Sequence, residues 1–194
     1  MDIQANQSWR LLGAVVAAVL FAMQTVAVAE VADSSTNGFT VKITTQVQAT
    51  PENVYSRIIR VGDWWSSDHT YSGDAHNLSL EERPGGCFCE KLANGGGVRH
   101  MEVVLLIPGK LLRMSGGLGP LQGMATAGSM TFSLAPADSS TTLEVTYAVV
   151  GYSAQGLSSI AVPVDHVLSE QITRLKNYIE KGDPGTKGDG AKPH

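Results

Sequence analysis

A long amphipathic helix near the end of this 194-residue chain constrains the fold more than any other segment. Apolar residues recur there at steps of three and four residues: Val164, Leu168, Ile172, Leu175 and Ile179. This spacing places them on one helical face, and charged residues occupy the opposite face. A helix with one apolar stripe has to bury that stripe against another layer of structure. Pro163 lies near its start, either in the first turn or at a kink if the helix begins at Ser158.

The segments before the helix alternate with the period of a β-strand. In residues 39–47 the odd positions are mostly apolar and the even positions are polar. The same alternation is found in residues 129–134 and 142–149. Further strands are expected in residues 78–81, 87–93, 98–107 and 111–115, separated by turns that contain Gly or Pro.

A short helix interrupts this order after the first strand, with Thr50 as the expected N-cap and Pro51 in the first helical position. The sequence therefore predicts an α+β domain, in which a curved antiparallel sheet of about seven strands grips one long C-terminal helix. We expect this domain to span residues 39–181. A flexible lead-in is expected over residues 30–38, and a disordered tail over residues 182–194.

The composition argues against several classes of function. The net charge is −4 and no run of Lys and Arg is present, so a nucleic-acid partner is not expected. The glycines at positions 116, 117 and 119 do not lie between a strand and a helix, as a dinucleotide site requires. We expect no cofactor.

The N-terminus predicts export. Residues 11–28 are nearly all apolar, and Ala27-Val28-Ala29 has the small-x-small pattern of a signal-peptidase site. Residues 1–29 would then be a signal peptide, and the protein would be periplasmic in a bacterium or otherwise secreted. The alternative is an uncleaved single-span anchor, the only membrane contact that we expect.

Four short motifs carry a resemblance to a known family. They are Thr50-Pro51-Glu52-Asn53-Val54-Tyr55, Trp64-Trp65, Pro84-Gly85-Gly86-Cys87-Phe88 and Pro108-Gly109-Lys110-Leu111-Leu112. With the order of elements, they resemble the START-like helix-grip superfamily (SRPBCC; polyketide cyclase/dehydrase and lipid-transport type). The resemblance implies a deep apolar cavity between sheet and helix. It implies no particular reaction, because members include lipid carriers, hormone receptors, cyclases and activators of chaperone ATPases.

Eight residues are candidates for the wall of such a cavity: Trp64, Trp65, Phe88, His100, Arg113, Met130, Phe132 and Tyr147. Adjacent Trp side chains point in different directions, so we expect at most one of Trp64 and Trp65 in the core. A Trp at the cavity mouth would suit an amphiphilic ligand. Arg113 is either an outward residue of its strand or a partner for a ligand carboxylate or Glu90.

Cys87 and Cys89 lie two residues apart on one strand and so share a face. They are interpreted as two buried small apolar residues, with a disulfide and a metal or redox role as alternatives.

Glu90, His100 and Glu102 are the strongest polar candidates for a functional site. A short turn at residues 94–97 would bring Glu90 opposite His100. Simple alternation turns Cys87, Cys89, Met101, Val103 and Leu105 inward and leaves the polar group in solvent. The family resemblance instead places Phe88 in the cavity, together with His100, Val104 and Leu106. The two registers differ by one residue, and both remain open. A zinc site would need His69, His76 or His166, whose spacing does not support one.

The leading function hypothesis is noncatalytic binding or transport of a small hydrophobic or amphiphilic molecule outside the cytoplasm. The second is an enzyme of cyclase or dehydratase type that uses His100 and Glu90 as acid and base on a polyketide-like or aromatic ligand. The third is a protein-interaction module that uses the loop at residues 116–122. The sequence does not indicate an oligomeric state.

We expect the mature protein to begin at or near Glu30, because signal peptidase cleaves after the small-x-small pattern. N-terminal sequencing of the protein from its native compartment checks this. An intact Met1 in a soluble cytosolic fraction would contradict export.

Overall fold

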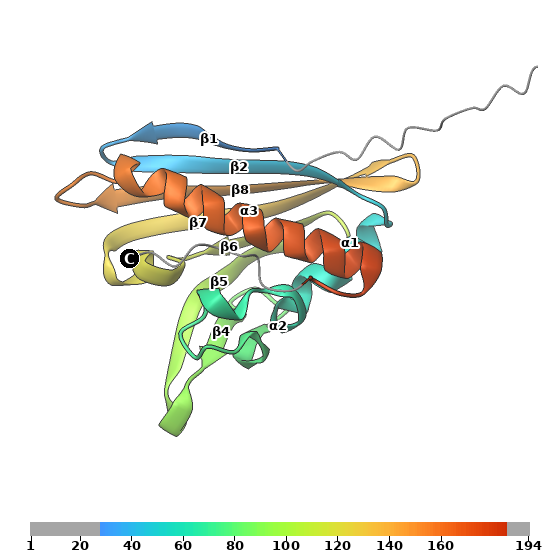
Figure 1. The fold of residues 1–194 in the computed structure, drawn as a ribbon, viewed down its shortest axis with the longest axis horizontal. Helices are drawn as coiled ribbons and strands as arrows, with labels where there is room; N and C mark the ends of the chain where they lie inside the picture. The colour runs from blue at the N-terminus through green and yellow to red at the C-terminus, as the bar shows by residue number, and fades with distance from the viewer. Residues whose placement is uncertain (1–27, 186–194) are drawn as a thin grey trace, which may run out of the picture.

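The computed structural model describes residues 28–185, which form an α+β domain with one long helix across a curved sheet (Figure 1). All the strands pair antiparallel in one sheet, in the order β1-β2-β8-β7-β6-β5-β4-β3. The eight strands are β1 (Val28–Ser35), β2 (Gly38–Val47), β3 (Leu78–Leu80), β4 (Cys87–Lys91), β5 (Gly97–Ile107), β6 (Leu111–Ser115), β7 (Ala125–Ala137) and β8 (Ser140–Tyr152). The helices are α1 (Pro51–Ile59), α2 (Val61–Trp64) and α3 (Ser158–Lys181), with four short 3₁₀ turns. The expected helix-grip-like fold class is confirmed.

The structure describes the two ends of the chain only in part. Residues 1–27, most of the expected signal peptide, lie outside the described residues, as do residues 186–194 of the expected tail.

The expectation of a flexible lead-in at residues 30–38 was wrong. This segment forms most of edge strand β1, which pairs with β2 from Val28↔Thr44 to Ser35↔Gly38 and brings the sheet to eight strands. Most β1 side chains from Glu30 onward are exposed. An edge strand like this is held by backbone hydrogen bonds to its neighbour, so it shows no apolar alternation in the sequence.

The alternation in β2 and β8 builds the core as expected. Phe39, Val41, Ile43 and Val47 are buried, and Ile43 pairs with Val145 of β8. On the other side of β8, Val145 pairs with Phe132 of β7. These inward residues form the apolar layer on which the helices pack.

Helix α1 begins as the sequence predicts, since the Thr50 side chain accepts a hydrogen bond from the Asn53 amide at 3.4 Å. Helix α3 begins at Ser158, so Pro163 lies inside it rather than at its first turn. Helix α3 packs mainly against β1 and β2 and against helices α1 and α2 (Figure 1). The β3–β5 end of the sheet lies further from α3. The segment around α2 lies beside this end of the sheet (Figure 1).

Residues Ile172 and Leu175 lie in the middle of the α3 stripe and are 2% and 0% exposed. We expect Ile172→Ala or Leu175→Ala to lower the free energy of unfolding by about 2–5 kcal/mol, because each leaves a cavity in a close-packed core. Chemical denaturation measures the change. Thr173→Ala, at an exposed position on the same helix, is the control. A loss below about 0.5 kcal/mol at both buried positions would show that α3 does not grip the sheet.

Candidate functional site

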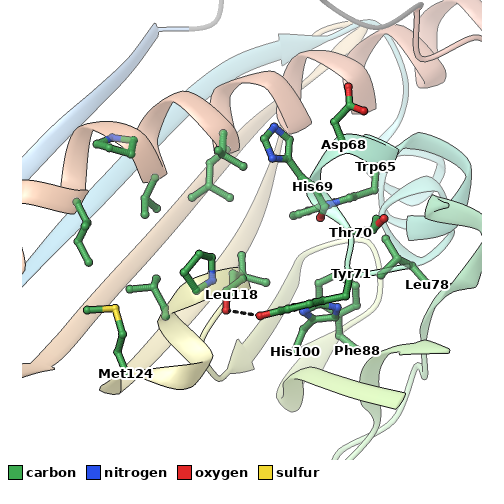
Figure 2. Close-up of a pocket in the computed structure, with 18 residues that line it drawn as sticks. Trp65, Asp68, His69, Thr70, Tyr71, Leu78, Phe88, His100, Leu118 and Met124 are labelled. Atoms are coloured by element: carbon green, nitrogen blue, oxygen red, sulfur yellow. Dashed lines mark hydrogen bonds between the residues drawn. The ribbon is translucent and has the colours of Figure 1, made fainter. Parts of the chain in front are cut away.

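A cavity of about 460 Å³ lies between α3 and the β3–β5 end of the sheet (Figure 2). Its volume is within the range of small-molecule sites. One wall is the apolar face of α3, formed by Ile160, Pro163, Val164, Val167 and Leu168. The opposite wall is the loop before β7, formed by Leu118, Gly119, Pro120, Leu121 and Met124. The remaining lining residues come from residues 65–71 and from strands β3–β5, and include Leu78, Phe88 and His100.

The loop that forms the second wall is held by Tyr147 of β8. The Tyr147 hydroxyl accepts a hydrogen bond from the Leu118 amide at 3.1 Å and donates one to the Gly116 carbonyl at 3.2 Å. Burial raises the pKa of Tyr147 to about 12, so the hydroxyl stays neutral and available for both bonds. Only Gly fits at position 128, since a Cβ there would lie 2.5 Å from the Gly116 oxygen and 2.7 Å from the Tyr147 ring. The loop thus has a fixed anchor.

Both Trp side chains are buried, so the expectation that at most one enters the core was wrong. Trp64 is the last residue of α2, whereas Trp65 has an extended backbone, and this change of conformation lets both rings turn inward. Their indole N–H groups donate to the carbonyls of Arg57 and His69, each at 3.0 Å. Trp65 lines the pocket beside Phe88, with ring centroids 5.8 Å apart.

Two irregularities in strand pairing resolve the register. Strand β5 bulges opposite the Phe88–Cys89 step of β4, where Met101 pairs with Phe88 and Arg99 pairs with Cys89. His100 is the extra residue, so His100 and Met101 are both buried although they are neighbours.

The second irregularity lies between Val103 and Leu105, where β5 pairs with β6, and it leaves Val104 and Leu105 exposed. Each register considered from the sequence was therefore right in part. Phe88, Glu90 and His100 are buried, as are Met101 and Val103. Glu90 pairs with Val98 and not with His100. Glu102 is only half-buried, and it accepts a hydrogen bond from Arg99 at 2.9 Å.

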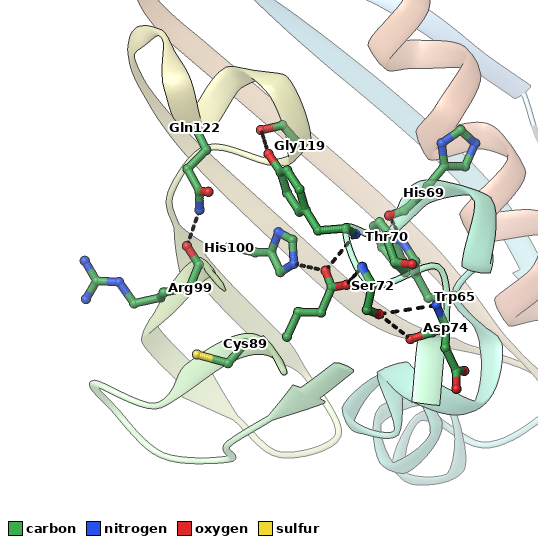
Figure 3. A network of polar contacts seen from close by, with 12 residues as sticks. Trp65, His69, Thr70, Ser72, Asp74, Cys89, Arg99, His100, Gly119 and Gln122 are labelled. Carbon is green, nitrogen blue, oxygen red and sulfur yellow. Dashed lines mark hydrogen bonds and ion pairs between the residues drawn. The ribbon is translucent and has the colours of Figure 1, made fainter. Parts of the chain in front are cut away.

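The buried Glu90 and His100 side chains contact each other directly (Figure 3). The distance between Glu90 Oε2 and His100 Nε2 is 3.0 Å. Glu90 also accepts hydrogen bonds from the backbone amides of Tyr71 and Ser72. The His100 ring lies between Tyr71 and Phe88, with centroid distances of 5.9 and 5.1 Å. The pair is therefore held by hydrogen bonds to Glu90 and by ring contacts to His100.

The hydrogen bonds decide the charge of Glu90. Burial by itself raises the pKa of the carboxyl, but the bonds from Ser72, Tyr71 and His100 lower the pKa by more, so the net pKa lies below its ordinary value. Glu90 is therefore ionised at neutral pH, so Nε2 of His100 is the donor in their hydrogen bond.

The other nitrogen of His100 has no partner. Nδ1 is buried and makes no hydrogen bond within residues 28–185. Such an orphaned buried polar atom is uncommon, because it costs about 1–3 kcal/mol. The His100 ring is also one of the residues that line the pocket.

The remaining polar side chains at the pocket, at residues 68–71, all have partners of their own. Asp68, His69 and Thr70 lie along one side, and His69 Nε2 is 3.1 Å from the Glu170 carboxylate of α3. The Tyr71 hydroxyl donates to the Gly119 carbonyl at 2.9 Å and bridges two walls (Figure 2). Among the described residues that line the pocket, none is Lys or Arg.

Of the eight residues expected in the cavity wall, the pocket is lined by Trp65, Phe88 and His100. Trp64, Met130, Phe132 and Tyr147 are buried in the core, away from the pocket lining. Of the two positions expected for Arg113, the outward one is observed and the one in the cavity wall is not, because Arg113 is exposed and donates to the Thr131 hydroxyl at 2.9 Å.

The sequence reasoning did not single out residues 68–71 as part of the site. These residues show no periodic pattern of apolar side chains. Their position in the sequence shortly after Trp64-Trp65 was the only feature that could have pointed to the site. The five α3 lining residues belong to the amphipathic helix that the sequence did predict.

Cys87 and Cys89 form a disulfide, with their Cα atoms 5.3 Å apart. Phe88 and Glu90 take the inward positions of β4, so the two cysteines lie on its other face. The interpretation as two buried apolar residues was wrong, and the disulfide alternative is the one observed. Disulfides persist in oxidising compartments.

Two further properties concern residues 28–185. These residues contain no group of three His, Cys, Asp or Glu side chains placed to hold a metal ion. They also contain no helix that combines the length and the apolar character needed to cross a bilayer.

No family model and no curated protein matches the sequence. Solved structures do match the fold. CalU16 from Micromonospora echinospora is 18% identical with a TM-score of 0.52, over 83% of this chain and 88% of that one. The Aha1 dimer from Colwellia psychrerythraea is 19% identical with a TM-score of 0.52, over 74% and 97%.

A third match is DynU16, a protein of the dynemicin biosynthetic locus, which is 19% identical with a TM-score of 0.53. That match covers 75% of this chain and 48% of that one. At such identities the likenesses show the fold alone, and they agree with the expected helix-grip architecture.

The depressed pKa of Glu90 makes stability depend on pH. The carboxylate stabilises the folded state fully above its ordinary pKa, and this contribution is lost as the pH falls through the lower pKa of the folded state. We expect the free energy of unfolding to fall more steeply for wild type than for Glu90→Gln between neutral pH and about pH 3. Denaturation at several pH values measures both slopes. Glu102→Gln, on the neighbouring strand, is the control. Equal slopes for wild type and Glu90→Gln would mean that Glu90 is not held ionised by these bonds.

Proposed function

We propose that this protein binds a small, largely apolar molecule in the pocket between α3 and the sheet, as a carrier or binding protein. The observation that carries the proposal is the pocket itself, about 460 Å³ of space walled mainly by apolar side chains from α3 and the loop at residues 118–124. These walls are fixed by the core on one side and by the Tyr147 anchor on the other. A preformed pocket spares the ligand the cost of ordering the protein.

The hydrophobic effect supplies the driving force. Removing apolar surface from water is worth about 25 cal/mol per Å², so a ligand that buries about 300 Å² gains roughly 7 kcal/mol before the cost of immobilisation. Among the described residues that line the pocket, His100 has a buried side-chain atom, Nδ1, without a hydrogen-bond partner. A ligand with one polar group and an apolar body fits this combination.

The proposal includes export, with the protein acting outside the cytoplasm. The apolar segment at residues 11–28 and the cleavage pattern before Glu30 support it. The Cys87–Cys89 disulfide supports it independently, because cytosolic thiols are generally kept reduced.

We expect N-phenyl-1-naphthylamine, a neutral dye whose fluorescence rises in apolar surroundings, to bind the folded mature protein saturably. Val167→Phe places a larger side chain in the pocket wall and should weaken dye binding about tenfold or more, which corresponds to about 1.4 kcal/mol. Fluorescence titration measures the affinity, and chemical denaturation shows whether the variant is folded.

Val162→Phe is the matched control. Val162 lies on the same helix but is 67% exposed and does not line the pocket. Dye affinity should be unchanged in this variant. The absence of saturable binding to the folded protein, or equal weakening by both substitutions, would argue against the pocket as the binding site.

A second function, general-base catalysis, is favoured by one observation, the buried Glu90–His100 pair with Nδ1 unpartnered. Nδ1 could take a proton from the carbon beside a ketone, leaving an enolate and an imidazolium that remains bonded to Glu90. Return of a solvent deuteron would restore the ketone. NMR of 1-tetralone in D₂O tests this, since loss of the C2 proton signal should be faster with wild type than with His100→Leu. Equal rates would leave binding as the function.

A further inference from the structure

The polar groups at the pocket are arranged for one class of ligand. His100 is 6% exposed and lines the pocket, and its Nε2 is occupied by the ionised Glu90. In the neutral imidazole the proton is then on Nε2, and Nδ1 presents a lone pair. In this neutral state the atom left for the ligand is a hydrogen-bond acceptor.

The charges around the pocket disfavour an anion. Glu90 lies behind His100, and Glu170 is paired with His69 at the edge of the pocket. No Lys or Arg is found among the described lining residues, and Arg113 is engaged with Thr131 away from the pocket. A buried carboxylate without a cationic partner is strongly unfavourable.

We propose that the pocket selects neutral apolar molecules that carry an O–H or N–H donor, such as a phenol or an alcohol, and rejects carboxylates of the same shape. The ligand's donor bonds to His100 Nδ1, and its apolar body lies between α3 and the loop at residues 118–124. This inference rests on the proposed binding function and specifies the ligand class of the same site. It excludes fatty acids in their ionised form.

Three compounds of one shape test it: 2-naphthol, which has a donor; 2-methoxynaphthalene, which has none; and 2-naphthoate, which is an anion. Each displaces N-phenyl-1-naphthylamine from the wild-type protein at about pH 8, above the ordinary range of histidine. We expect 2-naphthol to bind about tenfold tighter than 2-methoxynaphthalene, and 2-naphthoate to bind most weakly. In His100→Leu the first two compounds should bind alike, whereas His76→Leu, at an exposed position outside the pocket, should keep the preference.

A spectroscopic measurement makes the test independent of the variant's folding. In protein labelled with ¹⁵N at histidine, 2-naphthol should shift the Nδ1 resonance of one residue, and 2-methoxynaphthalene should not. That residue should be His100, identified by the resonance missing in His100→Leu, or by its proximity to Phe88 if this variant does not fold.

The outcomes separate the two proposals. Dye binding with equal affinity for the three compounds, or with 2-naphthoate tightest, overturns the ligand class and leaves the binding function standing. Failure of the dye and of all three compounds to bind overturns the binding function and this inference with it.

Discussion

The packing of α3 against the sheet is the constraint on which the rest of the structure depends. The helix packs mainly against β1 and β2 and against α1 and α2, and Ile172 and Leu175 of its apolar stripe are buried. Helix α3 covers the β1–β2 side of the sheet, so the β3–β5 end is left for other segments to cover. The cavity lies at this end, between the helix, the loop before β7 and residues 65–71. The same packing that stabilises the fold therefore creates the pocket.

The Glu90–His100 pair is the second organising feature. A buried carboxylate is costly, and here hydrogen bonds from two backbone amides and one imidazole offset that cost. Those amides belong to Tyr71 and Ser72, so the carboxylate ties the segment after the Trp pair to β4. Tyr71 then reaches across to Gly119 and stacks on His100. One buried charge thus helps to assemble two pocket walls while leaving His100 Nδ1 unpartnered.

Binding and catalysis draw on the same geometry at this site. The apolar walls can hold a ligand without any reaction, and the fixed imidazole can either accept a hydrogen bond or take a proton. The fold does not choose between these roles, because helix-grip architectures of similar shape serve several functions. The ligand's own chemistry decides, since only an acidic C–H placed at Nδ1 would turn an acceptor into a base.

Local patterns in the sequence were enough to determine the fold class. The 3.6-residue stripe of α3, the alternation in β2, β7 and β8, and the Thr50 cap are properties of neighbouring residues, and each appears in the structure. They did not reveal β1, whose pairing uses backbone groups that every sequence has. They also could not place Arg113 or His100. The face on which a strand residue lies depends on every bulge before it, and one extra residue in β5 turns His100 and Met101 both inward. The pocket was decided by tertiary structure alone, because its walls come from segments far apart in the chain that meet only when α3 packs on the sheet.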